Sequence, residues 1–234
     1  MEISSTPIIH RVKFFEDIIE TTMAKTTGDV DQWIDKVCET SFTDQCKPED
    51  FFVGLDSEYA LILQLCFNRR CLIFQLWCAV EIPTSLINFL QNPKFTFIGI
   101  AIERDDCLLS KYYGLSLSHN RKNLPSLAEE LYPRGGFNCR SLKELARVCL
   151  KKEVQKPIET INSDWKAKDL SIPQIEYACI DAFVALEVGI YLYKMSLNVA
   201  ELSYHSDENV EYWSDGDEVE SSQVHGPETP TNCN

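Results

Sequence analysis

Short apolar runs dominate the first hundred residues and predict β-strands. Residues 7–24 alternate and carry β-branched side chains, which is typical of a hairpin. Three runs at 51–57, 60–67 and 71–77 are separated by almost no polar sequence, so they predict an antiparallel meander. A further apolar run at 95–102 predicts a fourth strand after the hairpin.

Helical spacing of apolar residues appears between these strands and dominates after them. Ser141 and Glu144 form a capping box, which marks the start of one such helix. Helices are predicted at 28–42, 83–91, 105–113, 124–131, 141–152 and from about Pro173 to Leu197. Strands followed by helices indicate an α/β domain with a mixed central sheet flanked by helices.

The charge of the chain is unevenly distributed. The net charge is −14, and residues 201–234 hold nine acidic side chains with no Lys or Arg, which leaves −5 for residues 1–200. The acidic segment from about 199 onward lacks apolar periodicity and is predicted to be a disordered tail. The mildly acidic remainder does not exclude a polyanionic ligand.

The chain shows no membrane or secretion signal. No apolar run approaches the roughly 20 residues that a membrane helix needs, and MEISSTPIIH is unlike a signal peptide. The ten cysteines form no CxxC pair. We therefore expect an intracellular protein with free thiols and no membrane partner, in the nucleus, the cytoplasm or both.

Two carboxylates interrupt the apolar strand at 51–57. Asp56 and Glu58 project to the same side, because side chains at i and i+2 share a face. They either lie at a strand end in water or share a cation, and hard oxygen ligands favour Mg²⁺ or Mn²⁺. Two more carboxylates suit the second interpretation: Asp105 follows the strand at 95–102, and Asp181 shares a helical face with Tyr177.

This order of motifs resembles the DEDDy family of 3′–5′ exonucleases, and most closely the Werner-type exonuclease domain. The matching segments are FVGLDSE, LQLC, FIGIAIERD, SLKELARVCL, NSDW and LSIPQIEYACIDAFVAL, within residues 50–195. The N-terminal HRVKFF and VDQWI are similar to small single-domain plant members. The resemblance implies a ribonuclease H-like (DnaQ-like) fold. It divides the chain into an N-terminal hairpin and helix at 1–49, an exonuclease domain at 50–198 and an acidic tail at 199–234.

The resemblance also implies a mechanism with two divalent ions, Mg²⁺ or Mn²⁺. Asp56 would bridge the ions, Glu58 and Asp181 would complete one site, and Asp105 would help to hold the other, partly through water. Tyr177 would orient the water that attacks the terminal phosphodiester. The expected substrate is the 3′ end of DNA or RNA, and the product is a nucleoside 5′-monophosphate.

One departure from the family pattern keeps an alternative open. Only Tyr59 separates Glu58 from the next apolar run, where family members have a polar loop. A catalytically silent member that binds nucleic acid or protein is therefore the second hypothesis. Candidate nucleic-acid contacts are Leu55, Arg69, Arg70 and Trp165. Self-association and a protein partner for the acidic tail stay open.

Overall fold

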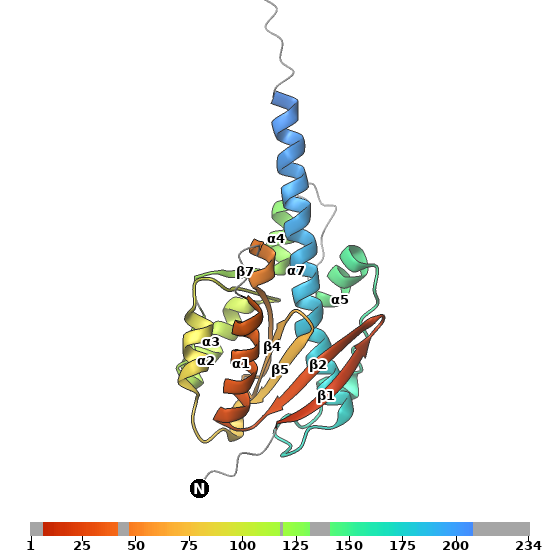
Figure 1. The fold of residues 1–234 in the computed structure, drawn as a ribbon. Helices are drawn as coiled ribbons and strands as arrows, with labels where there is room; N and C mark the ends of the chain where they lie inside the picture. The colour runs from red at the N-terminus through yellow and green to blue at the C-terminus, as the bar shows by residue number, and fades with distance from the viewer. Residues whose placement is uncertain (1–6, 42–46, 118, 132–140, 208–234) are drawn as a thin grey trace, which may run out of the picture. The chain divides into compact units, whose positions relative to one another are not determined.

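A seven-stranded mixed sheet forms the centre of the computed structural model (Figure 1). The structure describes residues 7–41, 47–117, 119–131 and 141–207. The chain divides after Asn198 into two units, and the sheet lies in the first. The strands are β1 (Ile8–Phe14), β2 (Asp17–Ala24), β3 (Phe52–Glu58), β4 (Ile62–Phe67), β5 (Arg70–Gln75), β6 (Thr96–Gly99) and β7 (Arg121–Asn123).

The strand order is β1-β2-β5-β4-β3-β6-β7. The predicted hairpin and the predicted meander are both present, because β1 pairs with β2, and β4 pairs with β3 and β5, in antiparallel fashion. Parallel pairs join β2 to β5, β3 to β6 and β6 to β7. The hairpin therefore extends the same sheet, which confirms the predicted mixed α/β architecture.

Helices cover both faces of this sheet. They are α1 (Thr27–Ser41), α2 (Thr84–Gln91), α3 (Ile102–Tyr113), α4 (Leu124–Leu131), α5 (Leu142–Leu145), α6 (Ile158–Ile161) and α7 (Ile172–Asp207). One apolar core lies between the sheet and α1, α2 and α3. The other lies between the sheet and α4, α5 and α7. Among the described residues, none of the helices is long and apolar enough to span a membrane.

The long helix α7 packs directly on the backbone of β3. A Cβ atom at Gly54 would lie 2.0 Å from the carbonyl oxygen of Ala182, so only glycine allows this approach. The contact fixes α7 along β3. As a result, Asp181 and Tyr177, which precede Ala182 on α7, lie beside the carboxyl end of β3.

Some boundaries differ from the predicted ones for local reasons. β6 ends at Gly99 because Ala101 adopts a left-handed conformation (φ 50°) and α3 begins at Ile102. The helix predicted at 141–152 is α5 followed by a π-helical turn at Ala146–Leu150. The last helix runs to Asp207 rather than ending near Leu197. Residues 208–234 of the predicted tail lie outside the described residues.

Candidate metal centre

β3 carries Asp56 and Glu58 to its carboxyl end, on the face that packs against α7. Asp56 pairs with Gln64 of β4, and Glu58 pairs with Ile62 at the last position of the ladder. The Glu58 side chain is 9% exposed, and Asp56 is half-buried. Both carboxylates therefore face the interior at a strand end, which is an expensive arrangement unless something offsets their charge.

The shortened connection after Glu58 is a tight turn that leaves the strand ends in register. Tyr59 and Ala60 have φ values of 54° and 56°, and the Leu61 N–H donates to the Glu58 carbonyl at 2.8 Å. Two successive positive φ values are typical of the type I′ hairpin turn, in which Asn-Gly is preferred. The turn keeps Glu58 in the strand. Tyr59 and Ala60 are strained there, because a residue with a Cβ atom rarely adopts a positive φ.

α7 contributes Asp181 and Tyr177 from consecutive turns of one face. The Asp181 side chain is 2% exposed. One ligand atom from each of Asp56, Glu58 and Asp181 lies within 4.8 Å of the other two. The predicted convergence therefore holds for these three carboxylates, although they come from segments more than a hundred residues apart.

Asp105, the fourth predicted carboxylate, lies beside this group but is held differently. It is 9% exposed in the first turn of α3, and its Oδ1 accepts a hydrogen bond from the Ser57 hydroxyl at 2.8 Å. Its negative charge raises the pKa values of both Asp56 and Glu58. Asp105 is thus an electrostatic neighbour of the group of three.

A cavity of about 310 Å³ opens over the carboxylates. Its polar lining comes from Asp56, Glu58, Ser141, Lys156, Tyr177 and Asp181, and its apolar lining comes from Leu55, Ile100, Leu142 and Ala185. Asp105 does not line it. The carboxylates can hold a cation that binds an anionic group of a ligand. The apolar side chains can contact a flat, less polar part of the same ligand.

Lys156 is the site residue that sequence reasoning missed. Its Nζ donates to Asp181 Oδ2 at 2.7 Å and lies 5.2 Å from the centre of the Tyr177 ring. In the sequence it is one of many scattered basic residues. No periodic pattern distinguishes it, because it lies in the irregular segment between the π-helical turn and α6.

Burial raises the pKa values of all four carboxyl groups, and repulsion from neighbouring carboxylates adds to the effect for Asp56 and Glu58. For Glu58, burial and then the charge of Asp181 raise the pKa to about 7. For Asp105, burial raises the pKa to about 6 although the Ser57 hydrogen bond opposes the change. Burial also raises the pKa of Asp56 and of Asp181, in Asp181 against the opposing charge of Lys156.

These shifts and the donor set fit a divalent cation. A single lysine cannot balance the carboxylates, whereas a divalent ion would offset their repulsion and keep them ionised. The donors are carboxylate oxygens without a thiolate or an imidazole among them, which favours Mg²⁺ or Mn²⁺ over softer metals.

Tyr177 is held at the edge of this charged group. Its hydroxyl lies close enough to the Asp181 carboxylate to favour the ionised form of that group. Burial and the neighbouring negative charges raise the pKa of Tyr177, so the phenol stays protonated. Its ring centre lies 6.0 Å from that of Trp165. The hydroxyl is therefore a fixed donor beside the carboxylates.

The predicted nucleic-acid contacts fall in three different places. Leu55 is 1% exposed and lines the cavity. Trp165 is 2% exposed and its indole N–H donates to the Ile161 carbonyl at 3.2 Å, so it supports Tyr177 and offers no free ring face. Arg69 and Arg70 lie at the β4–β5 turn and line a separate hollow. The structure does not bring them to the carboxylates.

Comparison with known proteins finds similar chains among the 3′–5′ exonucleases. A 3′–5′ exonuclease from Arabidopsis thaliana is 26% identical over 185 residues, which cover 74% of this chain and 62% of that protein. A 3′–5′ exonuclease from Drosophila melanogaster is 26% identical over 182 residues, which cover 74% of this chain and 50% of that protein. The chain thus spans less than two thirds of the length of either relative.

Solved exonuclease structures share the fold. The EXO domain of Aedes aegypti Nibbler matches with a TM-score of 0.65 and 16% identity, over 81% of this chain and 94% of that one. Brucella melitensis NrnC matches with a TM-score of 0.55 and 18% identity, over 71% of this chain and 91% of that one. These likenesses confirm the predicted ribonuclease H-like fold. The 3′–5′ exonuclease family model matches residues 53–196, more than half of the sequence, and the chain therefore belongs to that family.

Proposed function

We propose that this protein is a metal-dependent 3′–5′ exonuclease of the DEDDy type, which releases nucleoside 5′-monophosphates from nucleic-acid ends. The observation that supports it most is the convergence of Asp56, Glu58 and Asp181 within 4.8 Å. Three carboxylates at that separation, one of them half-buried and two buried, are strongly unfavourable without a cation. Family membership gives the reaction class.

Asp56, Glu58 and Asp181 would hold the divalent ions, with Asp105 assisting from the Ser57 side of the group. When bound, such ions supply hydroxide from water and neutralise charge on the leaving oxygen. Tyr177 stays protonated beside the carboxylates, so its hydroxyl can orient the attacking water. The apolar wall at Leu55 would seat the terminal sugar and base and exclude bulk water.

Lys156 would keep the metal-free site intact. Its ammonium group lies 2.7 Å from Asp181 Oδ2 and balances the negative charge of that carboxylate. Metal binding at Asp181 would compete with this ion pair. The freed ammonium group, still tethered at the cavity rim, could then interact with a substrate phosphate.

The experiment is degradation of single- and double-stranded RNA and DNA that carry a label at the 3′-terminal nucleotide or at the 5′ end. With Mg²⁺ or Mn²⁺, the 3′ label should appear as mononucleotide from the start, while the 5′ label moves through a ladder of shortened strands. EDTA should abolish both. The structural neighbour NrnC is known bound to pGG, which makes short strands suitable first substrates.

The same experiment separates the silent binding module from the enzyme. The tight turn at Tyr59 and Ala60 is the observation that motivates this second candidate, since it replaces a polar loop next to Glu58. A protein that binds labelled ends and releases no mononucleotide with either metal would favour it.

A further inference from the structure

A second hollow, which we call the arginine hollow, lies at the β4–β5 turn beside the β1–β2 hairpin. It has a volume of about 530 Å³ and is lined by Arg11, Arg69 and Arg70 together with Asn68 and two glutamates. Three guanidinium groups around one depression stand out in a chain whose net charge is −14.

The strand register places Arg11 and Arg70 on either side of one glutamate. Arg11 of β1 and Arg70 of β5 are both direct partners of Glu20 in β2. The Glu20 carboxylate lies 3.7 Å from the Lys36 ammonium group, and it makes no ion pair with either arginine. Within the part of the chain that the structure describes, Arg11 and Arg70 have neither an ion pair nor a hydrogen-bond partner for their side chains.

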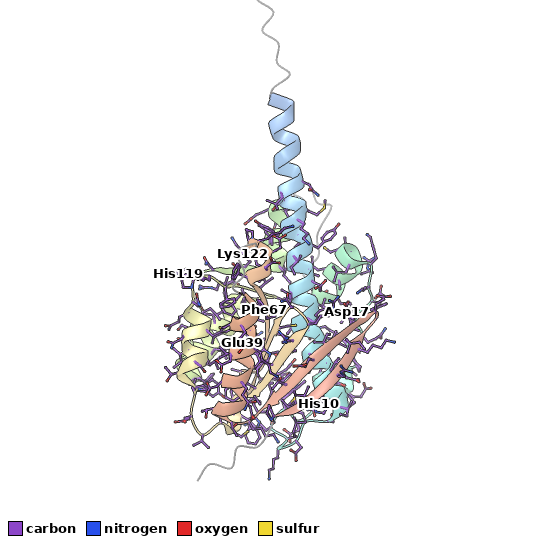
Figure 2. All side chains as sticks on the ribbon, in the orientation of Figure 1. His10, Asp17, Glu39, Phe67, His119 and Lys122 are labelled. Atoms are coloured by element: carbon purple, nitrogen blue, oxygen red, sulfur yellow. The ribbon has the colours of Figure 1, made fainter. Side chains whose placement is uncertain are left out.

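Arg69 is anchored, and its position is thereby fixed. Its Nε and one terminal nitrogen donate to Asp17 Oδ1 at 2.8 and 2.6 Å. Asp17, labelled at the tip of the hairpin in Figure 2, also accepts from Lys152 at 3.1 Å. Arg69 and Lys152 thus neutralise Asp17, whereas Arg11 and Arg70 have no ion pair of their own among the described residues.

The other acidic member of the lining is Glu187 on α7. Burial, followed by the negative charge of Asp17, raises the pKa of Glu187 on α7. A planar guanidinium presents several N–H donors in a fork that matches phosphate oxygens, and the Asn68 amide adds a further polar group. The volume lies within the range of pockets that bind small ligands.

The hollow lies at the other end of β4 from the carboxylates. Glu58 pairs with Ile62 at the first residue of β4, and Arg70 pairs with Phe67 at its last residue. Five residues of strand separate these positions, or about 17 Å. A phosphate in the hollow therefore cannot be the scissile one.

We propose that Arg11 and Arg70, with Arg69, form a phosphate-binding site distinct from the carboxylate cavity. Two ligands carry this chemistry. One is a phosphodiester of a nucleic-acid strand, an assignment that rests on the proposed function. The other is the phosphate of a free nucleotide.

Equilibrium binding of a 5′-fluorescein-labelled single-stranded RNA 12-mer tests the proposal. The full chain in EDTA is titrated while fluorescence anisotropy is followed at several salt concentrations. The double variant Arg11→Gln/Arg70→Gln should bind about tenfold more weakly than wild type, and its log–log salt slope should fall by about 1.4, because two phosphate contacts are lost. Arg11→Lys/Arg70→Lys should recover part of the affinity, since it keeps the charge and loses the fork.

The matched control is Lys122→Gln/Lys168→Gln, which removes two exposed positive charges outside the hollow. Lys122 lies on β7, at the opposite edge of the sheet from β1. The control should bind nearly as wild type does. Equal affinity and equal salt slope for wild type and the Arg11→Gln/Arg70→Gln variant, at matching melting temperatures, would overturn the proposal.

Competition identifies the source of the phosphate. If the ligand is a strand, millimolar GMP or inorganic phosphate leaves the 12-mer bound. If it is a free nucleotide, micromolar GMP reduces 12-mer binding in wild type and has no effect in the double variant. Because EDTA prevents hydrolysis, this result is independent of whether the chain cleaves nucleic acid.

Discussion

The ammonium group of Lys156 lies 2.7 Å from the Asp181 carboxylate and 5.2 Å from the centre of the Tyr177 ring. The pair joins an irregular segment to α7 at the floor of the cavity. Asp181 is 2% exposed, so its charge depends on this lysine whenever no cation is present.

Lys156→Gln should destabilise the metal-free protein and have a smaller effect on the metal-bound protein. Removing one partner of a buried ion pair costs about 3–5 kcal/mol, and protonation of Asp181 will reduce that cost. The free energy of unfolding in urea, measured in EDTA and in excess Mn²⁺, tests the difference. An equal loss under both conditions would mean that Lys156 is not exchanged for metal. Lys166→Gln, an exposed lysine, is the control.

The metal-free protein should lose stability as the pH rises from about 4 to about 7. The pKa of Glu58 is raised to about 7 and that of Asp105 to about 6, whereas carboxyl groups of the unfolded chain titrate near 4. The folded state therefore holds more protons in this window, and its free energy of unfolding falls with increasing pH. For Glu58 alone the loss is on the order of 3 kcal/mol.

Urea denaturation in EDTA between about pH 4.5 and 8 checks this slope. Comparison with Glu58→Gln isolates the contribution of one carboxyl group, because other titrating groups cancel in the difference. The variant should show a flatter profile. Parallel profiles for the two proteins would show that Glu58 titrates normally.

Tyr59→Gly should stabilise the protein relative to Tyr59→Ala by about 1 kcal/mol, because glycine adopts positive φ without the Cβ penalty. Both variants remove a ring that is 64% exposed, so only the backbone term differs between them. Thermal denaturation provides the measurement. If alanine is as stable as glycine, the turn is not strained at this position.

Gly54→Ala should destabilise the fold by about 3 kcal/mol, at the upper end of the usual cost of overpacking, because the new methyl group meets the backbone of α7 at Ala182. Gly28→Ala in α1 is the matched control, since its Cβ would have no contact closer than 4.0 Å. The control should be neutral or slightly stabilising. Similar melting temperatures for the two variants would contradict the close approach of α7 to β3.

The parts of the site that could be predicted from the sequence are those fixed by local periodicity. Asp56 and Glu58 share a strand face at i, i+2, and Tyr177 and Asp181 share a helical face at i, i+4. Neither spacing depends on the rest of the fold. The prediction that the carboxylates of the strand and of the helix lie close together came from the order of the motifs. The structure brings three of the four carboxylates together.

The features that could not be predicted depend on contacts between distant segments. The ion pair of Lys156 with Asp181 joins residues 25 positions apart, on an irregular segment and on α7. β7 is only three residues long, with the sequence RKN, and carries no apolar alternation. The parallel pairing of β2 with β5 joins segments separated by a helix and two strands, and a hairpin pattern contains no information about its partner.

Trp165 illustrates the same limit for substrate contacts. Its position near the motifs suggested base stacking, but burial is decided by packing against Tyr177 and by the hydrogen bond to Ile161, neither of which the sequence reveals. Arg69 and Arg70 were named for their charge. The fold places Arg70 about 17 Å along β4 from the position of Glu58.

The rate of mononucleotide release by Tyr177→Phe, relative to wild type and Asp56→Asn, tests the central claim most directly. Substrate and Mn²⁺ are held at concentrations that saturate the enzyme. The melting temperature of each variant verifies that it is folded. Tyr177→Phe keeps the ring and deletes one hydrogen bond to the transition state, so the rate should fall by about 10²–10³. Asp56→Asn should lose activity by a still larger factor and should raise the melting temperature in EDTA, because it removes one of the mutually repelling carboxylates. Release of mononucleotides by Asp56→Asn at the wild-type rate would contradict the assignment of this site.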